Sequence, residues 1–136
     1  MAGATSVTVL GIRTDKPEAE LYLYDDKKEL GQLKWSAHRE LAETIHKKLD
    51  ELLSSQGQTL RSVRGIVCFK GPGSFTGLRI GLTVANALAY AQNIPIVARR
   101  GDDWLKKGIA DLQTGKNDKI ATPYYDRPAA TSAQKS

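Results

Sequence analysis

The amino-acid sequence predicts an α/β fold, a single lobe in which helices pack on a five-stranded mixed sheet. Three observations lead to this prediction. The chain has 136 residues, which is enough for one hydrophobic core. Short apolar runs of strand type alternate with longer runs that carry an apolar stripe at helical spacing. Turn-forming Gly, Pro, Asn and Asp residues stand between these runs.

The first part of the chain predicts three consecutive strands, at residues 7–12, 20–24 and 29–35. The first is an apolar run, the second combines Leu and Tyr, and the third alternates imperfectly. Lys16 and Pro17 mark the first turn, and Asp25 and Asp26 mark the second.

A helix is expected at residues 36–55, with Ser36 as its N-cap and Gly57 as its end. One stripe of this helix is apolar, and consists of Leu41, Ile45, Leu49, Leu52 and Leu53. A fourth strand follows at residues 63–69. The run at 82–92 predicts a second helix that ends at Asn93, and residues 94–97 predict a fifth strand.

Residues 102–112 have a helical pattern, whereas residues 113–136 are polar and have no clear period. The sequence therefore predicts a lobe at residues 1–112 and a flexible C-terminal tail at residues 113–136. The order β-β-β-α-β-α-β is that of a ribonuclease-H-like unit, which is one lobe of the actin and Hsp70 type of fold.

The charge distribution restricts the kinds of site that the chain can form. The formal net charge is +5, and residues 52–101 contain no Asp or Glu. A site that needs paired carboxylates, or a metal held by carboxylates, cannot be built from this segment alone. Its basic residues indicate either a solvated face or attraction to RNA or an acidic partner.

No apolar run reaches the roughly 18 residues of a membrane span, and the N-terminus has no signal-peptide pattern. The only cysteine, Cys68, lies in an apolar run and is expected to be a buried thiol. These features predict a cytoplasmic protein without a membrane partner.

The most informative segment is the glycine-rich run at residues 70–81, between the fourth strand and the second helix. It lacks the Lys of a Walker A loop. It has Thr76 where a dinucleotide fingerprint needs its third Gly, and Ser74 is misplaced for a nucleophile elbow. Two general interpretations remain, an anion-binding turn or a tightly packed corner, and the packed corner is favoured.

The run from Gly71 to Gly81, GPGSFTGLRIG, resembles the signature of the TsaB (YeaZ) family. Members of this family are accessory proteins of tRNA threonylcarbamoyladenosine synthesis. The resemblance extends over residues 7–98, with a shorter echo at 122–127. It implies an actin-type fold, usually of two lobes, of which this chain has a shortened, one-lobe form.

The second helix carries a partner hypothesis. Small residues recur every fourth position at Gly73, Gly77, Gly81, Ala85 and Ala89, which predicts a groove that another helix approaches closely. The neighbour is either the chain's own first helix or a second protein. The family resemblance implies pairing through both helices with a TsaD-like transferase or a second copy. The expected interface residues are His38, Leu41, Ile45, Leu49, Gly73, Phe75, Thr76, Gly77, Arg79 and Thr83.

The resemblance implies a non-catalytic partner, with no catalytic or metal-binding residues of its own. ATP-using relatives place an Asp where this chain has Arg13. The candidates for cofactor binding are weak and are limited to Arg13, Gly71 and Gly73. The family further implies a TsaE-like ATPase, ATP or ADP at the junction between subunits, and tRNA contact only through the complex.

Two alternatives remain open at this point. One is a reduced actin-like ATPase or phosphotransferase that uses Thr14, Asp15 and the glycine-rich turn. The other is a stand-alone homodimeric RNA-binding module.

Overall fold

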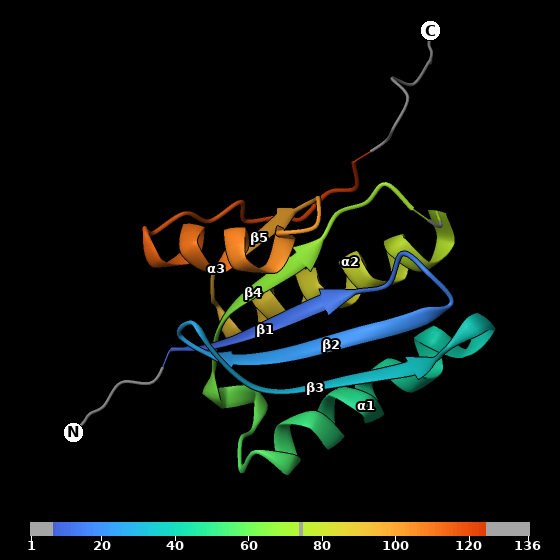
Figure 1. Cartoon of the computed structure of the whole chain (residues 1–136), viewed down its shortest axis with the longest axis horizontal. Helices are drawn as coiled ribbons and strands as arrows, with labels where there is room; N and C mark the ends of the chain where they lie inside the picture. Colours follow the sequence, from blue (N-terminus) through green and yellow to red (C-terminus); the bar gives the residue numbers. More distant parts are fainter. Residues whose placement is uncertain (1–6, 74, 125–136) are drawn as a thin grey trace, which may run out of the picture.

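The computed structural model describes residues 7–73 and 75–124. Five strands form one mixed sheet in the order β3-β2-β1-β4-β5 (Figure 1). The strands are β1 (Thr8–Arg13), β2 (Glu18–Asp25), β3 (Lys28–Ser36), β4 (Val63–Phe69) and β5 (Ile96–Arg99). Strand β2 is antiparallel to β1 and β3, whereas β4 is parallel to β1 and β5. The predicted α/β class and mixed five-stranded sheet are confirmed.

Three α-helices cover the two faces of this sheet (Figure 1). Helix α1 (Leu41–Ser55) contacts β2 and β3, and α2 (Phe75–Gln92) contacts β1, β4 and β5 on the same face. Helix α3 (Trp104–Gln113) contacts β4 and β5 from the opposite face. None of the helices in the described ranges is long and apolar enough to cross a membrane.

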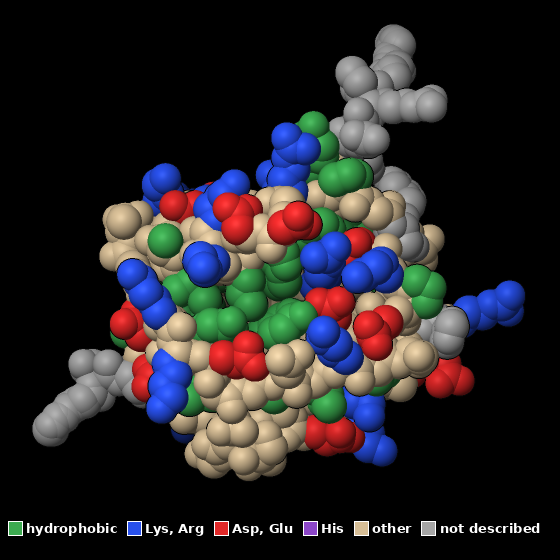
Figure 2. Space-filling model, viewed as in Figure 1, with side chains coloured by type: hydrophobic (Ala, Val, Ile, Leu, Met, Phe, Trp, Pro, Cys, Tyr) green, Lys and Arg blue, Asp and Glu red, His purple; other side chains and the backbone are tan. Residues whose placement is uncertain are grey.

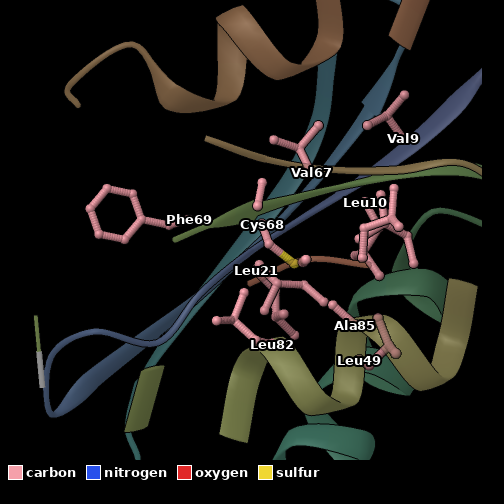
Figure 3. Close-up of a cluster of buried hydrophobic side chains, with 14 of the residues drawn as sticks. Val9, Leu10, Leu21, Leu49, Val67, Cys68, Phe69, Leu82 and Ala85 are labelled. Carbon is pink, nitrogen blue, oxygen red and sulfur yellow. The ribbon is translucent and has the colours of Figure 1, made fainter. Parts of the chain in front are cut away.

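The main core lies between the sheet and the α1–α2 layer. Cys68 is 1% exposed, and Figure 3 shows its side chain among Leu21, Leu82 and Ala85, whereas Val67 points toward α3. Successive residues of a strand point to opposite faces, so β4 contributes to both sides of the sheet. Burial raises the pKa of the Cys68 thiol. The expected buried, neutral cysteine is confirmed.

Glycines allow α3 to lie close to the sheet. A Cβ at Gly11 would come within 2.7 Å of Leu105 Cδ1, and one at Gly65 within 3.0 Å of Leu112 Cδ1. On the helix, a Cβ at Gly108 would collide with Val67. A side chain at any of these positions would force the helix outward or displace its neighbours.

The start of the first helix differs from its prediction. Ser36 is the last residue of β3 rather than an N-cap, and a 3-10 turn at His38–Glu40 precedes α1. The α-helix begins at Leu41 without a side-chain cap. Register with β2 explains the difference, because Ser36 pairs with Glu18 and thereby extends the strand.

The second helix is longer than predicted, because it begins at Phe75 rather than at residue 82. The glycines of its first two turns lower helix propensity, but Gly77 and Gly81 are packed against the end of β1. This tertiary contact outweighs the local preference.

The expected tail is also corrected for residues 114–124, which run along the edge of the sheet. Asn86 of α2 donates a hydrogen bond to Ala121 O and accepts one from Ala121 N. Asp118 N donates to Ile96 O, and Tyr124 N donates to Lys70 O. Residues 125–136 lie outside the described part of the chain. The ordered unit therefore reaches past residue 112, and α3 ends at Gln113.

Candidate functional site

The glycine-rich turn after β4 is a tightly packed corner. Gly71 has φ +100°, and a Cβ at Gly73 would collide with Asp15. The Thr14 hydroxyl donates a 2.8 Å hydrogen bond to Gly77 O, and a Cβ at Gly81 would collide with Thr14. These contacts come from the chain itself. They support the packed-corner interpretation of this segment.

The same contacts correct the predicted small-residue groove. Gly73 and Gly81 face the end of β1, and Ala85 and Ala89 are 0% and 4% exposed in the core. The stripe therefore packs within the chain. Of its other members, Gly77 is half-buried, accepts the Thr14 hydrogen bond and also lines a second hollow described below, and Gly73 is exposed.

Arg13 lies beside this corner and is held by its neighbours. Its Nε donates to Asp15 Oδ1 at 2.8 Å and its Nη2 to Asp15 Oδ2 at 3.2 Å. Its guanidinium carbon is 3.9 Å from the centre of the Phe69 ring. Burial opposes the charge, but the hydrogen bonds to Asp15 and the negative charges of Asp15 and Glu20 together outweigh it and raise the pKa of Arg13. The weak nucleotide candidates Arg13 and Gly73 thus both contact Asp15, and nucleotide binding there stays a prediction.

A second buried carboxylate, Glu20, is also paired. It accepts a 2.5 Å hydrogen bond from the Tyr22 hydroxyl, and its other oxygen lies 3.4 Å from Lys16 Nζ. Burial and this bond raise the pKa of Tyr22. Within the described ranges, no three His, Cys, Asp or Glu residues gather in an arrangement that could hold a metal ion.

A surface groove of about 490 Å³ lies between α1 and α2. We call it the α1–α2 groove. Its described lining consists of Ala42, His46, Thr76, Arg79, Ile80, Thr83 and Val84. The helices that form it lie side by side on the same face of the sheet (Figure 1).

The α1–α2 groove separates the predicted interface residues into two groups. Thr76, Arg79 and Thr83 are exposed and line it. By contrast, Leu41, Ile45 and Leu49 are 4%, 0% and 2% exposed. The interface prediction is corrected for Ile45 and Leu49, because the apolar stripe of α1 faces β2 and β3 and belongs to the core, whereas Leu41 also lines a second hollow described below. The side chains of His38 and Phe75 lie outside what the structure describes.

Sequence reasoning missed four lining residues: Ala42, His46, Ile80 and Val84. On α1, Ala42 and His46 each follow a buried stripe residue directly, which places them at the border of the stripe. Ile80 and Val84 are half-buried on the open side of α2. The sequence signal that could have identified them is an apolar residue next to a stripe that already suffices to cover the sheet.

A second hollow of about 540 Å³ continues from the first, and we call it the basic hollow. The two share Thr76 and Ile80. The described lining of the basic hollow consists of Lys16, Pro17, Ala37, Arg39, Leu41, Thr76, Gly77 and Ile80.

The opposite face carries a third hollow, of about 500 Å³, between β2 and α3. It is lined by Tyr24, Lys27, Lys106, Ile109 and Ala110. Figure 2 shows apolar side chains at the centre of this face, bordered by charges of both signs. The charged residues in its own lining are Lys27 and Lys106.

Sequence comparisons match the segment that contains both helices of the α1–α2 groove. The family model for TsaD, tRNA N6-adenosine threonylcarbamoyltransferase, matches residues 32–98. The chain is 38% identical over 63 residues to the tRNA threonylcarbamoyladenosine biosynthesis protein TsaB of Haemophilus influenzae, covering 43% of this chain and 27% of that protein. It is 40% identical over 60 residues to a tRNA N6-adenosine threonylcarbamoyltransferase of Geotalea uraniireducens, covering 44% and 18%.

Solved structures match a larger part of the chain. YeaZ from Pseudomonas aeruginosa is similar with a TM-score of 0.66 and 28% identity, over 80% of this chain and 50% of that one. RuvC of T. thermophilus matches with a TM-score of 0.52 and 14% identity, over 90% of this chain and 84% of that one, which shows the fold alone. These similarities confirm the ribonuclease-H-like architecture. The match spans about a quarter of the TsaB protein and half of the YeaZ chain.

Proposed function

Because the chain belongs to the TsaB (YeaZ) family, we propose that it takes part in tRNA threonylcarbamoyladenosine biosynthesis as an accessory protein. In this proposal it binds a TsaD-like transferase through the α1–α2 groove. The observation that carries the proposal is the position of this groove, whose described lining falls entirely within the matched residues 32–98.

The composition of the groove suits a protein partner. Ile80 and Val84 supply half-buried aliphatic surface, and Thr76 and Thr83 supply small exposed side chains beside it. Small residues let a neighbouring helix approach, and the aliphatic ones lose water on contact. A helix laid between α1 and α2 extends the existing two-helix layer.

The state of the polar groups supports an accessory rather than a catalytic role. Asp15 is held by Arg13, and Glu20 is held by Tyr22 and Lys16. Neither carboxylate is presented to a substrate by the described residues. The proposal therefore assigns the chemistry of threonylcarbamoyl transfer to the partner. An ATPase subunit and a nucleotide at the junction remain family-based expectations.

The test uses Thr83→Arg, which places a long charged side chain in the α1–α2 groove without disturbing the core. The chain and the TsaD-like protein of the same organism are co-expressed, and their complex is weighed by size-exclusion chromatography with light scattering. We expect a complex with the wild-type chain. We expect Thr83→Arg to weaken it by about 2 kcal/mol, roughly thirtyfold in Kd, because a central contact is obstructed.

Ser54→Arg is the matched control, because Ser54 is an exposed helix residue of α1 that lines neither the groove nor the basic hollow. It adds the same charge and should bind as the wild type does. Equal binding by Thr83→Arg and Ser54→Arg would place the contact elsewhere. The absence of any wild-type complex would contradict the proposed function itself.

A further inference from the structure

The basic hollow beside the α1–α2 groove indicates the chemistry of the partner. Arg39 is exposed, and no partner for its side chain is found among the described residues. Lys16 is half exposed and reaches Glu20 at 3.4 Å. Lys16 is thus partly neutralised, whereas Arg39 contributes an uncompensated positive charge to the rim.

The described lining of the groove and of the basic hollow contains no Asp or Glu. Its ionisable members are Lys16, Arg39, His46 and Arg79. The charge asymmetry follows from the sequence, since α2 has no acidic residue at all. Potentials of one sign over a concave surface attract ligands of the opposite sign.

Part of the same surface is apolar, so a ligand that binds through charge alone would leave this part uncovered. The two hollows share Ile80 and join Val84 and Ala42 on one side to Leu41 and Pro17 on the other. From Thr76 to Val84 the surface follows α2 for about 12 Å, or about two helical turns. An occupant must therefore cover aliphatic groups along α2 and also meet Lys16 and Arg39 in the basic hollow.

We propose that the partner docks with an amphipathic helix whose apolar side fills the α1–α2 groove and whose end presents carboxylates to Arg39 and Lys16. This inference rests on the proposed function and names the chemistry of its partner. Charge complementarity of this kind sets partner choice and association rate more than it sets total affinity. Arg39 is a specificity-determining residue of this interface.

An acidic protein segment fits this surface better than RNA does. Non-specific RNA binding depends on rows of cations that follow the phosphates, often with stacking platforms for the bases. The described lining offers instead aliphatic side chains, with Lys16 and Arg39 in the basic hollow and Arg79 in the α1–α2 groove, and it contains no Phe, Tyr or Trp on which a base could stack. RNA binding that requires Arg39 would contradict the inference.

The test measures association rates of the TsaD-like protein with four chains: wild type, Arg39→Glu, Arg39→Lys and Arg61→Glu. Arg61 is exposed in the turn Leu60–Ser62 and lines neither hollow. Arg39→Glu should slow association about tenfold at low salt. Arg39→Lys should restore most of the rate, and Arg61→Glu should match the wild type.

Salt provides a second readout. Between about 0.1 M and about 1 M salt the screening length falls from about 10 Å to about 3 Å, so the difference between Arg39→Glu and wild type should disappear. Thermal melts of each variant exclude unfolding as the cause.

If wild type binds but Arg39→Glu and Arg61→Glu behave alike, the charge inference fails and the proposed function stands. If the isolated chain binds tRNA, and Arg39→Glu abolishes that binding, the occupant is nucleic acid and the inference is overturned. If wild type binds no transferase, both fail.

Discussion

At the scale of single residues, the glycines of α2 have a structural role that their spacing alone does not reveal. The period of four correctly predicted that they share one face of the helix. It did not predict what that face contacts, because periodicity defines a direction but not a neighbour. In the structure, the neighbour of Gly77 and Gly81 is Thr14, which directly follows β1.

Gly81→Ala tests this close approach. Alanine favours a helix over glycine by about 1 kcal/mol, but its Cβ would collide with Thr14, and overpacking costs about 1–3 kcal/mol. We expect a net loss of up to about 2 kcal/mol in the free energy of unfolding, because Thr14 is buried and its hydroxyl is held by Gly77 O. Urea unfolding followed by circular dichroism measures this change.

Thr83→Ala is the control for that measurement, because Thr83 is exposed on the same helix. It should alter stability by less than about 0.5 kcal/mol. A stabilised Gly81→Ala chain would show that the helix does not lie as close to β1 as described.

At the scale of elements, Arg99 of β5 joins two other segments. Its Nε donates to Asp111 of α3 at 2.7 Å, and its Nη1 donates to Asp118 at 2.8 Å. The bond to Arg99 lowers the pKa of Asp111 below its ordinary value of 3.8. None of this was visible in the sequence, because the partners are separated along the chain by a helix and a turn.

This pairing predicts a pH dependence of stability. A carboxyl with a lowered pKa stabilises the fold fully above its unfolded-state value, and the contribution is lost as pH falls through the lower folded-state value. Asp111→Asn should therefore reduce the urea midpoint most near neutral pH. The gap to wild type should shrink as pH falls below about 3.8. A gap that is independent of pH would show that the pair does not titrate as described.

Element boundaries show where sequence reasoning ends. The strand at residues 63–69 was predicted with its observed limits, because its apolar run is bounded by a polar segment and a glycine turn. The stripe of α1 was also identified, but its role was not. Ile45 and Leu49 were assigned to a partner, whereas the sheet already covers them. The apolar face of a helix becomes buried against the nearest apolar surface, which here is the sheet of the same chain.

At the scale of the whole molecule, residues 114–124 protect an edge of the sheet. Ile96 N donates to Asn117 Oδ1, and Ala98 N donates to Asp118 Oδ2. These are backbone groups of β5, the last strand in the sheet order. The polar composition that suggested a tail supplies the acceptors that an exposed edge strand needs.

Replacing both acceptors, as Asn117→Ala with Asp118→Ala, should expose the edge of β5. We expect a loss of about 2 kcal/mol in the free energy of unfolding, and association that increases with protein concentration. Urea unfolding and light scattering measure the two effects. Lys116→Ala should be nearly neutral, because the Lys116 side chain is 62% exposed and Asp111 keeps its bond to Arg99. A double variant that matches Lys116→Ala would show that the edge needs no protection.

The buried thiol of Cys68 gives this chain a built-in reporter. A thiol-modifying reagent cannot reach a sulfur that is 1% exposed at the centre of the sheet, so labelling requires β4 to separate from α2. Labelling rates measured with and without the proposed transferase partner would therefore report whether that partner slows the separation of β4 from α2, with no engineered probe.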